Sequence, residues 1–240
     1  MTVTGVSDAT ERLDLRRRRG RRRRVLLIAI AAAVVVVLGV LAWLVFGSSV
    51  LGVKDVEVQG AKLVAAAEVE RVADVPAGQP LARVDLDAVA TRVSGLPAVA
   101  RVSVARQWPN TIRITLTERT PAFAIETPGG YWIADDQGII FDSAAQPPRG
   151  VLAARVPSGD ARLIRDLGTV LRSLPSEVRG KIRTLSAETP DSITLELPGG
   201  VTVIWGSAEQ SELKAQVLSV LMAQQHRVYD VSAPSNPVTR

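Results

Sequence analysis

An unbroken apolar stretch is the strongest feature in the pattern of hydrophobic and polar positions along this chain of 240 residues. The stretch covers residues 25–46 and contains no charged side chain. Because a helix rises about 1.5 Å per residue, it would be about 33 Å long, which matches the hydrocarbon thickness of a bilayer, about 30 Å. The pattern therefore predicts a single transmembrane helix over residues 25–46.

Arginines set the predicted orientation of this helix. The tail of residues 1–24 is rich in arginine, and Arg21, Arg22, Arg23 and Arg24 directly precede the apolar stretch. Basic residues beside a transmembrane helix remain on the cytoplasmic side of the membrane. We therefore expect the tail to be cytoplasmic, the chain to cross the cell (inner or plasma) membrane once, and the residues after the helix to lie outside it.

A cleaved export signal is the alternative interpretation of this segment. A basic region followed by an apolar region and small residues, here residues 47–49, is typical of such signals, and Arg23 and Arg24 could belong to a twin-arginine signal. The apolar region of a signal peptide, however, has only about 7–15 residues. Trp43, near the outer end, fits the aromatic belt of a helix that stays in the membrane. A retained helix is therefore favoured.

The residues that follow predict a small two-layer α+β unit. Strands are expected over residues 53–58, 99–104 and 112–116, and helices over residues 65–73 and 85–93. Ile112, Ile114 and Leu116 alternate with polar residues, and the Trp108-Pro109-Asn110 turn precedes them, which predicts a hairpin with one wet face. The order β-α-α-β-β predicts a three-stranded sheet with helices on one side.

The rest of the chain predicts a second, mixed α/β region with a largely antiparallel sheet. Strands are expected over residues 122–126, 131–134, 139–141, 181–187, 192–197, 201–205 and 228–232. A strongly amphipathic helix is expected over residues 160–174, where Pro175 ends it. Ser207 and Gln210 have the spacing of a capping box. The helix that they begin is expected to bury Leu213, Val217, Val220 and Leu221.

The net positive charge of the chain lies entirely in the tail. The first 24 residues contain nine arginines and three acidic residues, a net charge of +6, and the whole chain carries +5, so the remainder carries 5 − 6 = −1. A nucleic-acid-binding protein needs basic surface on its folded part, so this class is excluded. The chain contains no cysteine, so the exported part must be stabilised by packed cores without disulfides.

No catalytic, cofactor or phosphate-binding motif is recognisable in the sequence. The single histidine, His226, is expected to be a polar residue at a helix end. Asp135 and Asp136, followed by Gln137 and Gly138, are more typical of a tight turn than of a metal site. Carboxylate pairs far apart in the sequence, as in sugar hydrolases, stay open. We predict a protein that is not an enzyme and that needs no cofactor or metal.

Short motifs in a fixed order follow the predicted transmembrane helix. They are VEVQG (56–60), LPAVARV (96–102), QWPNT (107–111), ERTP (118–121), DDQGIIF (135–141) and YDVSAP (229–234). Their order and spacing resemble the FtsQ/DivIB family of bacterial cell-division proteins. The match runs from the membrane anchor to the last residue, and the Trp-Pro turn followed by Glu-Arg-x-Pro is its most specific part.

The resemblance implies a domain organisation and a function. Residues 51–119 would form a POTRA domain and residues 120–240 the so-called β domain. The protein would be a non-enzymatic scaffold of the division septum that binds FtsB and FtsL outside the membrane and helps control septal peptidoglycan synthesis. It would bind no nucleic acid and no small-molecule substrate. The alternatives are a POTRA-bearing component of envelope secretion or assembly and, less favoured, a cell-wall enzyme.

The resemblance also implies where partners bind. In the family, a partner strand adds to the open sheet edge made by the last strand of the β domain, which corresponds to residues 228–232 and the following residues 233–240, with the helix of residues 207–225 alongside. An open edge offers backbone N–H and C=O groups to a partner strand. Pro234 and Pro237 lack the donor and would limit this pairing. The implied binding residues are Val228, Tyr229, Val231, Ser232, Asn236, Val238 and Thr239.

Overall fold

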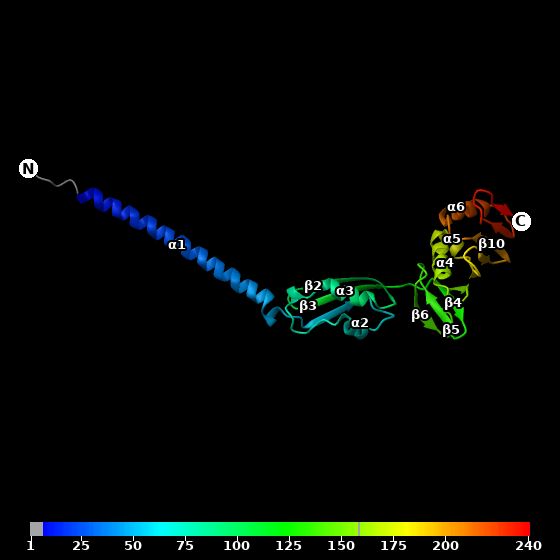
Figure 1. Ribbon diagram of the computed structural model, residues 1–240, viewed down its shortest axis with the longest axis horizontal. Coiled ribbons are helices and arrows are strands. Elements are labelled where there is room, and N and C mark those ends of the chain that lie inside the picture. Colours follow the sequence, from blue (N-terminus) through cyan, green and yellow to red (C-terminus); the bar gives the residue numbers. More distant parts are fainter. Residues whose placement is uncertain (1–6, 158) are drawn as a thin grey trace, which may run out of the picture. The chain divides into compact units, whose positions relative to one another are not determined.

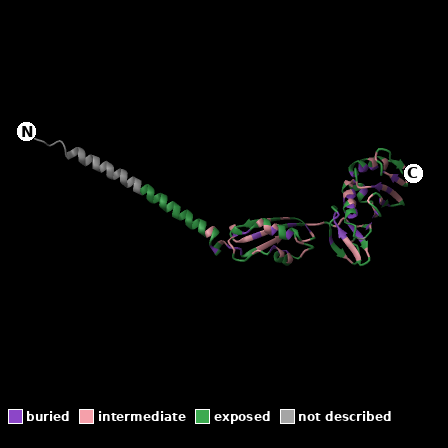
Figure 2. Ribbon diagram, viewed as in Figure 1, coloured by how far each residue is buried: buried purple, intermediate pink, exposed green. Residues whose placement is uncertain are grey.

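A long helix near the amino terminus is the first element of the computed structural model, which describes residues 7–157 and 159–240, with side chains from residue 26 onward (Figure 1). This helix, α1, covers Ser7–Phe46. Its Leu26–Phe46 part is the one helix among the described residues that is long and apolar enough to span a membrane. Side chains from residue 26 to residue 43 are all exposed, as the green colour in Figure 2 shows. The predicted apolar helix is therefore confirmed, and its surface is one that a bilayer would cover.

The next domain follows the predicted order β-α-α-β-β. Its elements are η1 (Ser49–Leu51), β1 (Asp55–Gln59), α2 (Ala66–Ala73), η2 (Leu81–Arg83), α3 (Leu86–Ser94), β2 (Val99–Gln107) and β3 (Thr111–Glu118). The strand order is β1-β3-β2, and β1 runs parallel to β3, with Val58 opposite Ile114. The two short 3-10 turns η1 and η2 were not predicted, since single turns leave no periodic signal.

One face of this three-stranded sheet forms the core of the domain. Ile112, Ile114 and Leu116 of β3 are buried, while Thr115 and Thr117, which alternate with them, are exposed. The buried face meets the apolar sides of the two helices, which carry the buried residues Val69, Ala73, Val89 and Val93. Alternation with a period of two in β3 and of about 3.6 in α2 and α3 thus produces the two layers.

Glu118 closes the far end of β3. Its carboxylate accepts hydrogen bonds from the backbone N–H groups of Lys62 (2.8 Å), Leu63 (2.8 and 2.9 Å) and Val64 (2.9 Å), just before α2. Partial burial works to raise the pKa of Glu118, but the three backbone donors outweigh it, and the pKa is lowered from the ordinary 4.5. The charged carboxylate therefore fixes the loop that leads into α2.

Replacing Glu118 with Gln is expected to destabilise this domain by about 1–2 kcal/mol at neutral pH, because a neutral amide is a weaker acceptor for three N–H groups. Since the folded pKa is lowered, the stabilisation is present above pH 4.5 and is lost as the pH falls through the folded value. Denaturation of both forms across acidic pH tests this. A difference between them that stays constant down to the lowest pH would contradict it.

The last domain contains a nine-stranded mixed sheet with helices on it (Figure 1). Its strands are β4 (Phe123–Thr127), β5 (Gly130–Ala134), β6 (Ile140–Ala144), β7 (Leu152–Arg155), β8 (Thr184–Ser186), β9 (Ile193–Leu197), β10 (Val201–Gly206), β11 (Val228–Asp230) and β12 (Val238–Thr239). Its helices are α4 (Ala161–Ser173), α5 (Ser176–Arg179) and α6 (Ser211–Leu221). The strand order is β12-β11-β10-β9-β8-β7-β4-β5-β6. Three neighbouring pairs, β4 with β7, β7 with β8 and β10 with β11, are parallel, and the other pairs are antiparallel.

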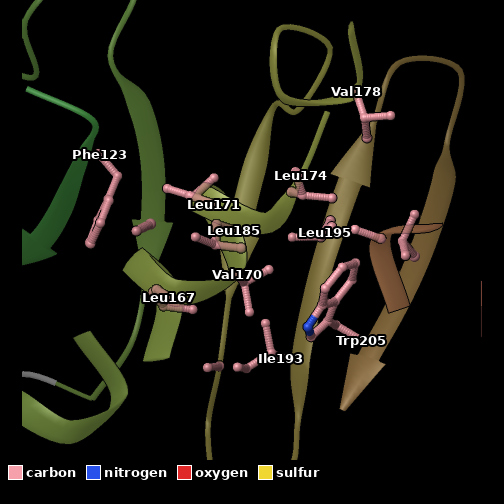
Figure 3. Close-up of a cluster of buried hydrophobic side chains, with 14 of the residues drawn as sticks. Phe123, Leu167, Val170, Leu171, Leu174, Val178, Leu185, Ile193, Leu195 and Trp205 are labelled. Carbon is pink, nitrogen blue, oxygen red and sulfur yellow. The ribbon is translucent and has the colours of Figure 1, made fainter. Parts of the chain in front are cut away.

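The helix α4 supplies much of the core of this domain. It links the parallel strands β7 and β8 and buries the face that its periodicity predicted, including Leu163, Ile164, Leu167 and Val170. Figure 3 shows side chains of α4 directed at those of β8 and β9. Asp160 caps the helix by accepting from the N–H groups of Arg162 and Leu163. Trp205 on β10 extends the same core toward β11 and is completely buried.

The β5–β6 turn uses Asp135 as the turn interpretation requires. One carboxylate oxygen accepts from the N–H groups of Gln137 (2.9 Å) and Ile139 (2.8 Å), and the other accepts from the guanidinium of Arg119 (2.6 Å). Gly138 has a φ of 75°, and a Cβ on it would lie 2.4 Å from the carbonyl oxygen of Ile164 in α4. The turn chemistry and the close approach to α4 account for the Asp-Gly pattern.

Three elements of this domain, β7, α5 and β12, escaped prediction. β7 has the sequence Leu-Ala-Ala-Arg, which carries little β propensity, and it is held by parallel pairing with β4 and β8. α5 is a single turn after Pro175. β12 has two residues and exists through its pairing with β11. Their pairing depends on contacts that are distant in sequence, which a local pattern does not report.

Candidate partner-binding edge

The predicted last strand does not form the edge of the sheet. β11 pairs with β10 in parallel on one side, with Tyr229 opposite Val203, and with β12 in antiparallel on the other, with Tyr229 opposite Thr239. The prediction that residues 228–232 form the open edge is therefore wrong, because residues 238–239 fold back and cover them. The edge on this side is β12.

Hydrogen bonds show which groups of β12 face outward. Arg240 donates its N–H to the carbonyl oxygen of Val228 (3.0 Å), and Val228 donates to the carbonyl oxygen of Arg240 (3.0 Å). Residues of an antiparallel strand alternate between bonding to the partner and pointing away from it. Thr239 lies between Arg240 and Val238, so its N–H and C=O point away from β11. The edge of β12 thus offers the backbone N–H and C=O of one outward-facing residue, Thr239. Pro237, two residues earlier in the chain, has no N–H.

The predicted binding residues separate into a buried and an exposed group. Tyr229 is 4% exposed and Val231 is completely buried, and the N–H of Val231 bonds to the carbonyl oxygen of Ile204 (2.9 Å). Their side chains belong to the core. Ser232, Asn236 and Val238 are exposed, while Val228 and Thr239 are half-buried. Ser232 is bonded through its N–H and its hydroxyl to Asp230 (3.0 and 2.6 Å), and the N–H of Asn236 to Ala233 (2.9 Å), so both shape the loop between β11 and β12.

The side chain of Tyr229 anchors the segment that joins α6 to β11. Its hydroxyl donates to the carbonyl oxygen of Gln224 (2.6 Å) and accepts from the N–H of His226 (3.0 Å). The ring of His226 lies edge-on to the ring of Tyr229, with centroids 5.9 Å apart. His226 also contacts the Gln224 side-chain amide oxygen (3.3 Å). The contacts of His226 therefore help hold the segment beside β11.

The start and the buried face of α6 both differ from the prediction. Gln210 is the N-cap with a φ of 54° and makes no side-chain cap bond, so Ser207 and Gln210 do not form a capping box. The buried residues are Ser211, Lys214, Ala215 and Leu218. Of the four predicted inner residues, Val217 and Leu221 are half-buried and pack against the core, whereas Leu213 and Val220 are 47% and 74% exposed. The N-cap lies three residues later than predicted, at Gln210 instead of Ser207, and the first buried side chains of the helix, those of Ser211 and Lys214, are polar.

Lys214 is the polar centre of this contact and was missed in the sequence. Its side chain is 2% exposed, and the ammonium donates to the carbonyl oxygens of Trp205 (3.0 Å) and Ser207 (2.8 Å). The Trp205 indole N–H donates to the Ser211 hydroxyl (3.1 Å), which donates to the carbonyl oxygen of Ala208 (2.7 Å). Burial lowers the pKa of Lys214, although Glu209 and Asp191 act in the opposite direction. The network fixes the turn between β10 and α6.

A stripe of apolar side chains remains on the outer side of α6. Leu213 and Val220 are exposed, and Val217 is half-buried because it also packs against the core. Their spacing of four and three residues places them on one side of the helix. We call these three residues the α6 stripe. α6 connects β10 to β11, so the α6 stripe lies at the end of the sheet that β12 completes. Within residues 26–157 and 159–240, whose side chains the structure describes, no group of His, Asp and Glu has the arrangement of a metal site.

Known families match both domains of the chain. A family described as "POTRA domain, FtsQ-type" matches residues 51–119, and one described as "Cell division protein FtsQ/DivIB, C-terminal" matches residues 123–233. The chain is 39% identical over 209 residues to a cell division protein FtsQ of Streptomyces bingchenggensis, which covers 82% of this chain and 79% of that protein. The chain belongs to the FtsQ/DivIB family.

A second FtsQ protein agrees with this family. A cell division protein FtsQ of Streptomyces coelicolor is 35% identical over 219 residues, 85% of this chain and 83% of that protein. A solved structure of the extracytoplasmic domain of DivIB from Geobacillus stearothermophilus is similar over 45% of this chain and 91% of that one, with 15% identity and a TM-score of 0.36. The FtsQ family consists of non-enzymatic division proteins, in accord with a sequence that lacks catalytic motifs.

The family match separates the two parts of the predicted site. Tyr229, Val231 and Ser232 lie inside the region that matches the FtsQ/DivIB family, which ends at residue 233. β12 lies beyond it. The arginines Arg21, Arg22, Arg23 and Arg24 lie outside the residues whose side chains the structure describes. The apolar helix that follows them is consistent with a single-pass membrane anchor.

Proposed function

We propose that this chain is a single-pass scaffold of the bacterial division septum that binds partners of the FtsB and FtsL type outside the membrane and so helps control septal peptidoglycan synthesis. The proposal divides the chain into a cytoplasmic tail of residues 1–24, a transmembrane helix of residues 25–46, a POTRA domain of residues 51–119 and a β domain of residues 120–240. Membership of the FtsQ/DivIB family and the apolar helix support it.

The main support for the proposed binding mode is that the backbone N–H and C=O of Thr239 point away from the sheet. A partner strand beside β12 would accept a hydrogen bond from the N–H of Thr239 and donate one to its C=O, since both groups point away from β11. The exposed side chain of Val238 and the α6 stripe add apolar surface at the same end of the sheet. A short edge limits unwanted pairing with other copies, because a two-residue strand preceded by proline offers few backbone groups.

The arginine tail supports the proposed topology. Arg21 to Arg24 precede the apolar helix directly, and positive charge beside a transmembrane helix favours retention of that end in the cytoplasm. The two folded domains would then lie outside the membrane, where the tether keeps them near membrane-bound partners and raises their effective concentration.

Replacing Thr239 with Pro tests the binding mode. Proline removes an N–H that makes no bond to β11, so the β domain should melt as wild type does, while binding to the FtsB-type partner should weaken about tenfold or more, or about 1.4 kcal/mol. Binding is measured with the purified full chain in detergent and the partner's extracytoplasmic region.

Thr239→Ala is the matched control, since it keeps the N–H and shortens only the side chain. It is expected to bind within about twofold of wild type, or about 0.4 kcal/mol. Wild-type binding by the Thr239→Pro form would move the partner site away from β12. Equal losses in both variants would assign recognition to the side chain instead of to strand addition.

A further inference from the structure

The Trp108 turn between β2 and β3 lies at the end of the POTRA domain that the chain enters from α1. The carbonyl oxygen of Asn110 in this turn accepts hydrogen bonds from the N–H groups of Lys54 (2.8 Å) and Asp55 (3.4 Å). Lys54 follows Phe46, the last residue of the apolar helix, by only eight residues. The turn is therefore bonded directly to the segment that leaves the membrane anchor.

The segment between the anchor and Lys54 is both short and fixed to the domain. Eight extended residues reach at most about 28 Å, and the 3-10 turn η1 shortens this reach further. Val53 bonds through its N–H to the carbonyl oxygen of Gln79 (2.9 Å) and through its own carbonyl oxygen to the N–H of Gly78 (2.8 Å). Gly52 forms a β-bridge with Pro80. This end of the domain must therefore stay close to a membrane that α1 spans.

Tryptophan exposure is concentrated at this end. Of the four tryptophans in the chain, Trp205 is completely buried and Trp132 is half-buried, whereas Trp43 is 63% exposed and Trp108 is 50% exposed. Trp43 belongs to the outer part of the apolar helix. Tryptophan prefers the membrane–water interface because its ring is apolar and its N–H is polar. An exposed Trp108 beside the anchor has the position and the chemistry of a second interfacial residue.

The charges around the turn fit the headgroup region of a bilayer. Lys54 and Arg83 are exposed, with Asp55 as the acidic residue next to Lys54. Arg106 donates to the carbonyl oxygens of Leu81 (2.8 Å) and Val84 (2.6 Å), which holds η2 beside the end of β2. Lys54 and Arg83 thus lie on segments bonded next to the Trp108 turn, where basic side chains are attracted to anionic lipid.

We propose that the Trp108 turn is a second membrane contact, which inserts into the lipid headgroups on the exported side. This contact restricts rotation of the POTRA domain about the segment of residues 47–54 that joins it to α1. Val50, which lies in this joining segment and is exposed, adds apolar surface to the same contact. The proposal rests on the proposed function in one respect, which is that α1 spans the bilayer. The contact is with lipid, and a protein partner at Trp108 is the competing result that the experiment must distinguish.

Quenching by brominated lipid tests the contact in the full chain, reconstituted into phosphatidylcholine vesicles with and without phosphatidylglycerol. Trp43→Phe removes the tryptophan of the anchor, so Trp108, Trp132 and Trp205 remain as emitters. Lipid brominated near the headgroup is expected to quench part of the remaining emission, and adding Trp108→Phe is expected to abolish that quenching. Phosphatidylglycerol is expected to increase the quenched part.

The outcomes separate this proposal from the membrane anchor. If lipid quenches the wild-type chain but not the Trp43→Phe form, the anchor is in the membrane and Trp108 is not, which would overturn the Trp108 contact. A role of Trp108 in binding a protein predicts that result. A wild-type chain that neither floats with the vesicles nor is quenched would overturn the anchor, and the contact with it.

Site-specific labelling gives a second measurement that leaves Trp108 in place. The chain has no cysteine, so Gln107→Cys and Thr117→Cys each carry one label, at exposed positions near the two ends of the hairpin. In vesicles, iodide is expected to quench a fluorophore at residue 107 at least about twofold less than one at residue 117, because the headgroup layer shields it. Equal quenching at both positions would overturn the proposal.

Discussion

Replacing Ile114 with Asp is expected to unfold the POTRA domain. Ile114 lies at the centre of β3, is completely buried, and pairs with Val58 of β1. Asp would remove an aliphatic contact and place a carboxylate among the buried faces of α2 and α3, a loss of about 4 kcal/mol or more. A domain of this size has a total stability of only about 3–10 kcal/mol. The variant should lose protection of the β1 and β3 amides against hydrogen exchange.

Thr115→Asp is the matched control for this prediction. Thr115 is the next residue of β3 and is exposed on the other face of the sheet, so the same carboxylate stays in water. Its effect on stability is expected to lie within about 0.5 kcal/mol of zero. Full amide protection in the Ile114→Asp form would contradict the assignment of this face to the core, and so would equal losses in the two variants.

The POTRA domain could be predicted almost completely because its signals are local. The alternation of Ile112, Ile114 and Leu116, and the helical spacing of Leu86, Val89 and Val93, each lie within about ten residues. The Trp108-Pro109-Asn110 turn then requires the last two strands to be neighbours. In α4 the same kind of regular spacing identified both the helix and its buried face.

The binding edge could be predicted only in part, because its geometry depends on distant contacts. β12 becomes a strand only where Val228 and Arg240 meet, and nothing within residues 236–240 indicates that pairing. In α6 the apolar side chains located the inner face only in part: Val217 and Leu221 pack against the core, whereas Leu213 and Val220 are exposed. The true inner face includes Lys214, whose acceptors Trp205 and Ser207 belong to the preceding strand and turn. A buried lysine carries no signal in a hydrophobic pattern.

The outward placement of the α6 stripe follows from that same lysine. When Lys214 and Leu218 face the sheet, the helical rotation of about 100° per residue carries Leu213 and Val220 to the outer side. In the proposed binding mode, this rotation places apolar surface at the same end of the sheet as β12. Fixing Lys214 therefore fixes both the end of β10 and the surface that α6 presents.

Replacing Lys214 with Met is the second large effect that we expect, a destabilisation of the β domain by about 2–4 kcal/mol. Methionine fills a similar volume and relieves the burial of a charge, which is favourable. It leaves the carbonyl oxygens of Trp205 and Ser207 without their donor, however, and each buried carbonyl without a partner costs about 1–3 kcal/mol. The second effect outweighs the first because two acceptors are affected. Gln216→Met, at an exposed position of the same helix, is the control and should change stability by less than about 0.5 kcal/mol.

The pH dependence of Lys214→Met distinguishes a buried ammonium from a generic packing defect. Since burial lowers the pKa of Lys214 in the folded chain, the unfolded chain binds the proton more readily between that lowered value and the ordinary 10.5. The stability of the wild-type domain relative to the variant should therefore rise as the pH increases through this window. Chemical denaturation of both forms at several alkaline pH values measures the difference. Parallel stability curves would mean that Lys214 has no lowered pKa, and a variant as stable as wild type at every pH would show that the Lys214 bonds do not hold the turn between β10 and α6.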